Sequence, residues 1–263
     1  MGDGTDRLFE YDPREPLDLL VREGPGISRV PEAAGQRLEL TSRGDRVPAR
    51  LLLPPTGNGP FPVILLQHGA GGSKEAEYLD VACAPWLRAG AAIAAIDFPL
   101  HGERTESKLG ELLGAPGRGR QDLAIEFARQ AVHDLRRTVD ALERLPALDA
   151  DRLAYAGFSL GTILGALFCA HDPRPRAAAL AVGGGGFGPP EVDPTRHVGR
   201  IAPRPTLFVN ARGDQTVPQS AAEALHAAAN EPKEVAWFEG THTELPGVAL
   251  KAMWTFLASS VGL

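Results

Sequence analysis

The sequence predicts one α/β domain in which a doubly wound, mostly parallel sheet carries helices on both faces. First, 263 residues with 43% apolar content can fill one large hydrophobic core, and this length falls short of several domains. Second, strand-like and helix-like segments alternate from residue 37 to the end. Third, several strand-like segments are unbroken apolar runs, which is typical of strands buried on both faces of a parallel sheet.

The chain opens with a segment that differs in composition from the rest. Residues 1–36 are rich in proline, glycine and charge, so we interpret them as an N-terminal extension that packs on a domain spanning residues 37–263. Residues 37–41 and 49–53 have strand character and are separated by turn-forming residues, Arg43-Gly44-Asp45. This pattern predicts an antiparallel hairpin at the start of the domain.

The buried strands follow, each joined to the next by a helix or a loop. Residues 63–67 form a continuous apolar run that ends in glycines. The clearest helical period covers residues 121–145, where apolar side chains recur on one face until Pro146 ends the helix. The other expected strands are 91–98, 152–158, 177–182, 206–210 and 234–238, and the other expected helices are 75–88, 160–170, 220–229 and 248–259.

Composition and charge exclude several classes of function. A net charge of −6 gives no basic surface for nucleic acid or anionic lipid, so neither is expected as a partner. No apolar run approaches the roughly 20 residues that span a bilayer, and the polar start lacks the pattern of a signal peptide, so we expect a soluble, cytoplasmic protein. Cys83 and Cys169 lack metal-ligand spacing and are expected to be buried free thiols.

The strongest chemical signal is the pentapeptide Gly157-Phe158-Ser159-Leu160-Gly161, because it lies where an expected strand ends and a helix begins. At such a turn the backbone of the serine bends sharply and its hydroxyl projects, while the two glycines remove side chains that would collide with neighbouring elements. The same pattern also occurs by chance in tight turns of glycine-rich chains. Residues elsewhere in the chain are therefore needed to decide whether Ser159 is a nucleophile or part of an ordinary tight turn.

A serine hydroxyl needs a general base that a third group orients. Asp214 follows the expected strand 206–210, and His242 follows the expected strand 234–238, so both lie at the sheet edge that holds Ser159. Taken singly, Asp214 is typical of a turn cap and His242 of a surface loop. Jointly, the order Ser, Asp, His along the chain predicts a catalytic triad of a nucleophile-elbow hydrolase.

A glycine-rich loop, Gln67-His68-Gly69-Ala70-Gly71-Gly72-Ser73, follows the strand 63–67. Acyl transfer places negative charge on the former carbonyl oxygen, and backbone amides beside the nucleophile stabilise it. We assign this oxyanion hole to the amides of Ala70 and Leu160, with His68, Gly69 and Gly71 as the supporting loop. A phosphate-binding loop is the competing interpretation, but neither GxxxxGK[ST] nor GxGxxG is matched.

With these motifs the chain resembles the α/β-hydrolase superfamily, and within it the serine-dependent members of the dienelactone hydrolase-like and esterase groups. The resemblance runs from about residue 37 to the end. It implies an α/β-hydrolase fold, with Ser159 as nucleophile, Asp214 as the acid and His242 as the base, and with the loop at His68 and Gly69 as the oxyanion element. Dienelactone hydrolases proper have cysteine at the nucleophile position, so Ser159 favours a general carboxylesterase.

Other polar residues near the expected site were weighed as metal ligands or triad members. His68 and His101 lie near Asp97 and Glu103 in sequence, but no HExxH or comparable ligand set occurs, so no metal and no cofactor are expected. The segment containing Asp97, DFPLHG, looks like the family's segment after the fourth strand, which is usually structural. Glu244 is an alternative partner for His242.

The surroundings of the expected site indicate an open pocket. Between the strands 177–182 and 206–210 only 23 residues remain, which is too short and too broken by glycine and proline for a large cap domain. We expect this segment, residues 103–120 and the extension before residue 36 to border the site. The oligomeric state is not predicted.

The function that the sequence predicts is hydrolysis of a small-molecule carboxylic ester, with short to medium acyl chains, through an acyl-enzyme on Ser159. The same residues are compatible with thioesterase, acyltransferase or aminopeptidase-like activity, because specificity depends on the shape of the pocket. A noncatalytic binding protein that retains the fold is the remaining alternative.

Overall fold

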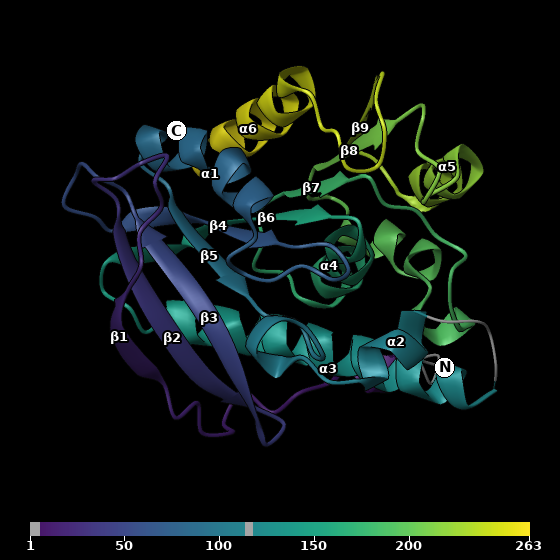
Figure 1. Cartoon of the computed structure of the whole chain (residues 1–263), viewed down its shortest axis with the longest axis horizontal. Helices are drawn as coiled ribbons and strands as arrows, with labels where there is room; N and C mark the ends of the chain where they lie inside the picture. Colours follow the sequence, from purple (N-terminus) through teal and green to yellow (C-terminus); the bar gives the residue numbers. More distant parts are fainter. Residues whose placement is uncertain (1–5, 114–117) are drawn as a thin grey trace.

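The computed structural model describes residues 6–113 and 118–263 and contains one mixed sheet with helices on both faces (Figure 1). Within these residues nine strands are hydrogen-bonded in the order β1-β2-β3-β5-β4-β6-β7-β8-β9. Their bounds are β1 (Leu20–Gly24), β2 (Ala34–Ser42), β3 (Asp45–Leu53), β4 (Phe61–Gln67), β5 (Ala92–Ile96), β6 (Leu148–Phe158), β7 (Ala178–Ala181), β8 (Thr206–Ala211) and β9 (Lys233–Phe238).

The sheet has an antiparallel part and a parallel part. β1, β2 and β3 are antiparallel neighbours, and β3 pairs antiparallel with β5. From β5 through β4 and β6 to β9 all neighbouring strands are parallel. The parallel strands therefore all present their carboxyl ends at one edge, where ligand sites of such sheets form.

Helices cover the sheet in two layers. α3, α4 and α5 pack on one face, and α1 and α6 pack on the other. The helices are α1 (Glu77–Ala89), α2 (Lys108–Leu113), α3 (Arg118–Leu142), α4 (Leu160–His171), α5 (Gln219–Ala228) and α6 (Gly247–Val261). Short 3₁₀ turns are η1 (Asp6–Phe9), η2 (Gly102–Arg104), η3 (Pro190–Val192), η4 (Pro194–Arg196) and η5 (Val198–Ile201).

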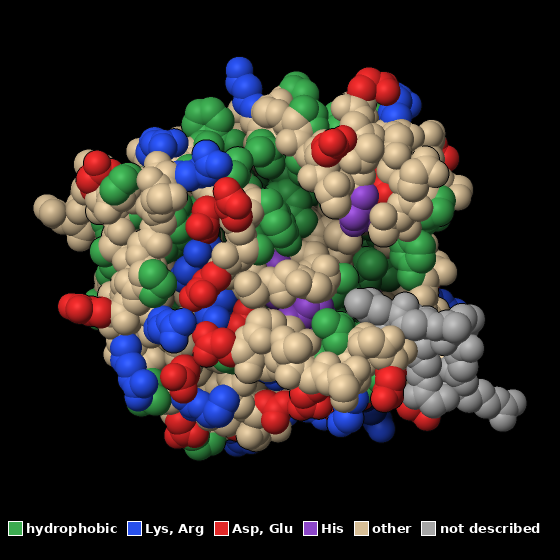
Figure 2. All heavy atoms as spheres, in the orientation of Figure 1, with side chains coloured by type: hydrophobic (Ala, Val, Ile, Leu, Met, Phe, Trp, Pro, Cys, Tyr) green, Lys and Arg blue, Asp and Glu red, His purple; other side chains and the backbone are tan. Residues whose placement is uncertain are grey.

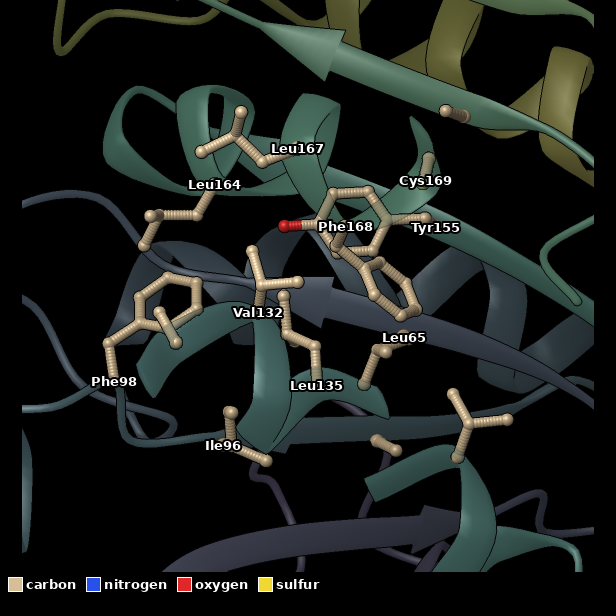
Figure 3. Close-up of a cluster of buried hydrophobic side chains, with 14 of the residues drawn as sticks. Leu65, Ile96, Phe98, Val132, Leu135, Tyr155, Leu164, Leu167, Phe168 and Cys169 are labelled. Carbon is tan, nitrogen blue, oxygen red and sulfur yellow. The ribbon is translucent and has the colours of Figure 1, made fainter. Parts of the chain in front are cut away.

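The sheet divides the core into two parts. In β4, Val63 and Leu65 pack toward α3 and α4, whereas Ile64 and Leu66 pack toward α1 and α6. Because both faces of the strand are buried, nearly every residue of β4 is apolar, and the sequence shows an unbroken apolar run. Figure 3 shows the first part, where side chains of α3 and α4 meet those of the sheet around Tyr155.

The expected fold class is confirmed, with helices on both faces of a mostly parallel sheet and no large cap domain among the described residues. Among residues 6–36, Phe9 and Leu17 are buried in the hydrophobic core, and an edge strand that was not predicted, β1, pairs with β2. The expected boundary at residue 36 falls inside β2. Both cysteines are buried and free, as expected.

The expected opening hairpin is formed by β2 and β3, which are longer than predicted. The short helix α2 was not predicted, and residues 114–117 of the expected border segment 103–120 lie outside the described residues, as do residues 1–5 of the extension. In the described parts of the chain, no helix combines the length and apolarity needed to cross a membrane.

Candidate active site

Ser159 occupies a sharp turn between β6 and α4. Its backbone has φ 53° and ψ −109°, and a positive φ is uncommon for any residue other than glycine. A residue in such a region costs about 1–3 kcal/mol and persists only where its surroundings fix it. The Ser159 amide still extends the sheet by donating to the Ala181 carbonyl at 2.9 Å. The turn is therefore the strained elbow that the sequence pattern indicates.

Close packing holds this elbow. A Cβ atom on Gly157 would lie 2.3 Å from the carbonyl oxygen of Gly161, and one on Gly161 would lie 2.8 Å from the carbonyl oxygen of Gln67. The Tyr155 hydroxyl donates to the Gly161 carbonyl at 2.6 Å, and the Thr162 hydroxyl lies within hydrogen-bond distance of the Gly157 carbonyl. Glycine is required at both positions because backbone occupies the space of a side chain.

The structure brings the three predicted triad residues together. His242 Nε2 lies 2.9 Å from Ser159 Oγ, and His242 Nδ1 lies 2.7 Å from Asp214 Oδ2. A carboxylate only accepts, so Nδ1 donates to Asp214, and Nε2 is left to accept the proton of the serine hydroxyl. The His242 side chain is 17% exposed. A general base hydrogen-bonded to a hydroxyl, and itself oriented by a buried carboxylate, is the arrangement that activates serine.

Asp214 is oriented by the turn that carries it. Its Oδ1 accepts the backbone amides of Thr216 and Val217, each at 2.8 Å, while Oδ2 accepts His242 Nδ1. Asp214 thus caps its own turn with one carboxylate oxygen and contacts His242 with the other. Glu244, the alternative partner, instead accepts the Thr241 hydroxyl at 3.0 Å.

The glycine-rich loop after β4 lies against the elbow. A Cβ atom on Gly69 would be 3.3 Å from Ser159 Cβ, so Ala70 follows a residue in direct contact with the nucleophile. Leu160 is the first residue of α4, and the first amides of a helix have no partner within it. The helix dipole places partial positive charge at the same end. The predicted oxyanion donors, the amides of Ala70 and Leu160, are therefore on the two segments that adjoin Ser159.

His68 supports the loop from inside the protein. Its ring is fully buried, with Nδ1 2.8 Å from the Gly69 carbonyl oxygen and Nε2 3.3 Å from the Phe98 amide. The carbonyl can only accept and the amide can only donate, so the ring must be neutral, with its proton on Nδ1. Burial lowers the pKa of His68 to about 4, in agreement with this pattern. His68 thus links the loop to the segment after β5, and His101 packs beside it.

An ion pair that the sequence analysis did not predict anchors the far end of the loop. Lys74 and Asp97 are buried side chains, 3% and 0% exposed, whose Nζ and Oδ2 atoms lie 2.8 Å apart. The Asp97 carboxylate also accepts the amides of Lys74 and Glu103, at 2.8 and 3.0 Å. Burial alone would lower the pKa of Lys74, but the hydrogen bonds to Asp97 and Glu103 outweigh it and raise that pKa. Asp97 thus ties two loops together beside the site.

Tyr78 is the second residue that sequence reasoning missed. It lies on α1, and its hydroxyl accepts the Gly69 amide at 2.7 Å while its ring packs edge-on against Phe158. Burial raises the pKa of the Tyr78 hydroxyl, and the hydrogen bond from Gly69 partly opposes this. The side chain nevertheless stays 43% exposed at the site. No motif marks such a residue, even though it lies only nine residues after Gly69.

The described acidic and histidine side chains near the site were considered above as metal ligands, and their contacts are as follows. The carboxylates of Asp97 and Glu103 both contact Lys74 Nζ, so this lysine occupies the carboxylates nearest to His68 and His101. Over residues 6–113 and 118–263, no three His, Cys, Asp or Glu side chains gather where they could hold a metal ion.

A cavity of about 560 Å³ opens beside the elbow, between α3, α4 and residues 186–194. Leu112, Leu160, Ile163 and Phe187 are among its lining residues. Two of the three segments expected to border the site contribute lining residues to this cavity, whereas described residues of the extension do not. Figure 2 shows one face of the molecule, with hydrophobic and histidine side chains visible in a central hollow.

Comparison with known proteins identifies the architecture. No family model and no curated protein matches the sequence. Among solved structures, the acetyl xylan esterase from Paenibacillus sp. R4 is similar, with a TM-score of 0.78 and 20% identity over 98% of this chain and 92% of that one. Acetyl xylan esterase 1 from Thermoanaerobacterium sp. JW/SL YS485 has a TM-score of 0.77 and 19% identity over 96% and 91%.

A third neighbour carries the name of the fold. The alpha/beta hydrolase GrgF from Penicillium sp. sh18 has a TM-score of 0.69 and 17% identity over 87% of this chain and 99% of that one. At such identities the similarity is one of fold. The chain therefore has the α/β-hydrolase fold that the motifs implied.

Proposed function

We propose that the protein is a serine hydrolase that cleaves carboxylic esters of small molecules, with Ser159, His242 and Asp214 as its catalytic triad. The observation that carries this proposal is the continuous chain of hydrogen bonds from Ser159 Oγ through both nitrogens of His242 to Asp214. The α/β-hydrolase fold, which the chain shares with solved structures named as esterases, supports the same reaction.

In the first half of the reaction, Ser159 Oγ attacks the carbonyl carbon of the ester while its proton passes to His242 Nε2. The amides of Ala70 and Leu160 donate to the oxygen that becomes negative, and Asp214 stabilises the positive charge on the imidazole. The carbon–oxygen bond to the alcohol then breaks, and His242 returns the proton to the leaving oxygen. The product of this half is an acyl-enzyme ester on Ser159.

In the second half, water replaces the alcohol. His242 Nε2 accepts a proton from the water as its oxygen attacks the acyl carbon, and the proton then goes to Ser159 Oγ as the acid leaves. Every proton transfer uses the same nitrogen. The proposed mechanism requires neither metal nor cofactor.

The first test is hydrolysis of 4-nitrophenyl acetate and butyrate. A burst of 4-nitrophenol in pre-steady state is expected, because the acyl-enzyme accumulates when deacylation is slower than acylation. Ser159→Ala is expected to lower kcat by about 10⁴-fold or more. Undiminished hydrolysis in that variant would contradict the proposal.

A matched pair of variants tests the acid of the triad. Asp214→Asn is expected to lower kcat by about 10⁴-fold, because an amide at this position favours the wrong tautomer of His242. Glu244→Gln makes the same carboxylate-to-amide change two residues from His242, where the side chain contacts Thr241 instead. It should leave kcat within twofold of the wild-type value. A large loss in Glu244→Gln with little loss in Asp214→Asn would reverse the assignment.

A further inference from the structure

We propose that the cavity between α3, α4 and residues 186–194 binds the acyl part of the substrate, and that this part is an apolar chain longer than acetyl. The inference rests on the ester hydrolysis proposed above and names the substrate class of that site. The proposed substrate differs from the acetyl esters that the names of two structural neighbours, both acetyl xylan esterases, indicate for those proteins.

The cavity reaches the residue that follows the nucleophile. Leu160 lines it and directly follows Ser159, so its side chain faces the cavity while its amide is an expected oxyanion donor. Ile163 and Leu164 lie one turn further along α4 and continue the same wall. A carbonyl group held at Ser159 therefore has the cavity open next to it.

The chemistry of the walls is almost wholly apolar. α3 contributes Ala124, Phe127 and Ala128, and Phe187 adds an aromatic ring from the loop after β7. Among the described lining residues none is charged, and Gln121 alone has a polar side chain. Sugar hydroxyls placed here would lose hydrogen bonds to water without finding partners, whereas methylene groups would gain by leaving water.

The size of the cavity also disfavours a very small acyl group. Its volume of about 560 Å³ lies in the usual range for ligand pockets, roughly 300–1,000 Å³. An acetyl group would contact only the part of the wall nearest Ser159. A longer chain would reach the rings of Phe127 and Phe187 and bury apolar surface on both sides.

The position of His242 assigns the cavity to the acyl side rather than the alcohol side. His242 Nε2 must deliver its proton to the leaving oxygen, so the alcohol lies on the side of the His242 loop. None of the described residues that line the cavity comes from that loop or from α6. The acyl part, which stays on Ser159 when the alcohol leaves, is therefore the part directed into the cavity.

The test measures kcat/KM for 4-nitrophenyl acetate, butyrate, hexanoate and octanoate. A rise of about threefold to fourfold per added methylene is expected while the chain is still being buried. The octanoate-to-acetate ratio of kcat/KM should exceed ten in the wild type. A ratio near one would overturn the proposal.

Ala124→Phe tests the cavity itself, because it inserts a ring into the wall on α3. The octanoate-to-acetate ratio is expected to fall at least tenfold, mainly through KM for the longer ester. Ala258→Phe is the matched control, since Ala258 is also half-buried on a long helix but does not line the cavity. Equal ratios in the two variants would contradict the assignment.

Phe187→Asp guards against a folding defect in the first variant. Phe187 is 51% exposed, so a polar residue there costs little core packing, while its charge at the cavity wall should lower the octanoate-to-acetate ratio.

Methyl and octyl acetate test the alcohol side. Their relative kcat/KM should not respond to Ala124→Phe, and a response in place of the acyl effect would place the alcohol in the cavity.

Binding separates failure of this inference from failure of the proposed function. In Ser159→Ala protein, calorimetry should detect decanoate, and adding Ala124→Phe should weaken its binding at least tenfold. If the wild type hydrolyses no ester while decanoate binding still depends on residue 124, the apolar site stands and the hydrolase proposal fails. If esters are hydrolysed but neither ratio nor binding depends on residue 124, the cavity does not hold the acyl chain.

Discussion

The two loops that meet at Ser159 are held in place by different means. The elbow between β6 and α4 is fixed by local packing, with Gly157 and Gly161 allowing backbone contacts that no side chain would permit. The loop after β4 is fixed by side chains from elsewhere in the chain, namely Asp97 and Tyr78, together with the buried ring of His68. A sequence motif can describe the first arrangement but not the second.

The largest effect is expected from removing the ionic anchor of the loop after β4. Asp97→Ala leaves the buried Lys74 ammonium with Glu103 alone and two backbone amides without their acceptor. The free energy of unfolding, measured by urea denaturation, should fall by about 3–4 kcal/mol. Because the loop carries Ala70, kcat for 4-nitrophenyl acetate should fall as well.

Asp45→Ala is the control for that variant. The Asp45 side chain is largely exposed, and its contact with Arg104 is long, at 3.5 Å. Its removal should change the free energy of unfolding by less than about 0.5 kcal/mol. Similar losses in both variants would mean that the buried pair does not anchor the loop.

Crowding the elbow should have the next largest effect. In Gly157→Ala the new Cβ would meet the Gly161 carbonyl oxygen at 2.3 Å, so the turn would have to shift. We expect the free energy of unfolding to fall by about 2–3 kcal/mol and kcat to fall with it. Gly247→Ala, where a Cβ meets nothing within 4 Å, should cost almost nothing. If Gly157→Ala were as benign as Gly247→Ala, packing would not define the elbow.

Acid should weaken the loop after β4 through His68. The pKa of His68 is about 4 in the folded protein and about 6.5 in the unfolded chain, so between these values the unfolded state binds more protons. The contribution of neutral His68 to the free energy of unfolding is therefore complete above pH 6.5 and is lost as the pH falls toward 4. His68→Gln should reduce the loss of unfolding free energy between pH 7 and pH 5 by about 1–2 kcal/mol.

Urea denaturation of wild type and His68→Gln at several pH values checks this prediction. His133 and His226 also have their pKa lowered to about 4 by burial, so the variant should keep part of the dependence on pH. An unchanged dependence would show that His68 takes up its proton as easily in the folded protein as in the unfolded chain.

The smallest effect concerns Tyr78. Tyr78→Phe keeps the ring against Phe158 but removes the acceptor of the Gly69 amide. The free energy of unfolding should fall by about 1 kcal/mol. If the hydrogen bond positions the loop for the transition state, kcat should fall about fivefold with little change in KM. Tyr11→Phe removes a hydroxyl that contacts Asp140 instead, and should alter stability without altering kcat. Equal kcat values in the two variants would remove Tyr78 from this role.

The same contrast explains how much could be predicted from the sequence. The parallel strands, and the positions of Ser159, Asp214 and His242 at strand ends, were predictable because buried strands and strand-end turns have local patterns. The register of the sheet then brings the three residues together, as the hydrogen bonds of His242 show.

The residues that were missed act through contacts distant in sequence. Lys74 and Asp97 are 23 residues apart, and neither lies in a motif that indicates a buried pair. β1 was missed because its exposed edge gives it no apolar alternation, with four of its five residues exposed. The cavity depends on how α3 packs against α4, which a helical period alone does not determine.

The most direct test of the account is to identify the residue that reacts with diisopropyl fluorophosphate. The phosphorus should bond to the nucleophile with loss of fluoride, and peptide mapping by mass spectrometry locates the adduct. We predict one adduct per chain, on Ser159, and none in Ser159→Ala. An adduct on another residue, or none in protein that hydrolyses 4-nitrophenyl esters, would contradict the assignment of Ser159 as the nucleophile.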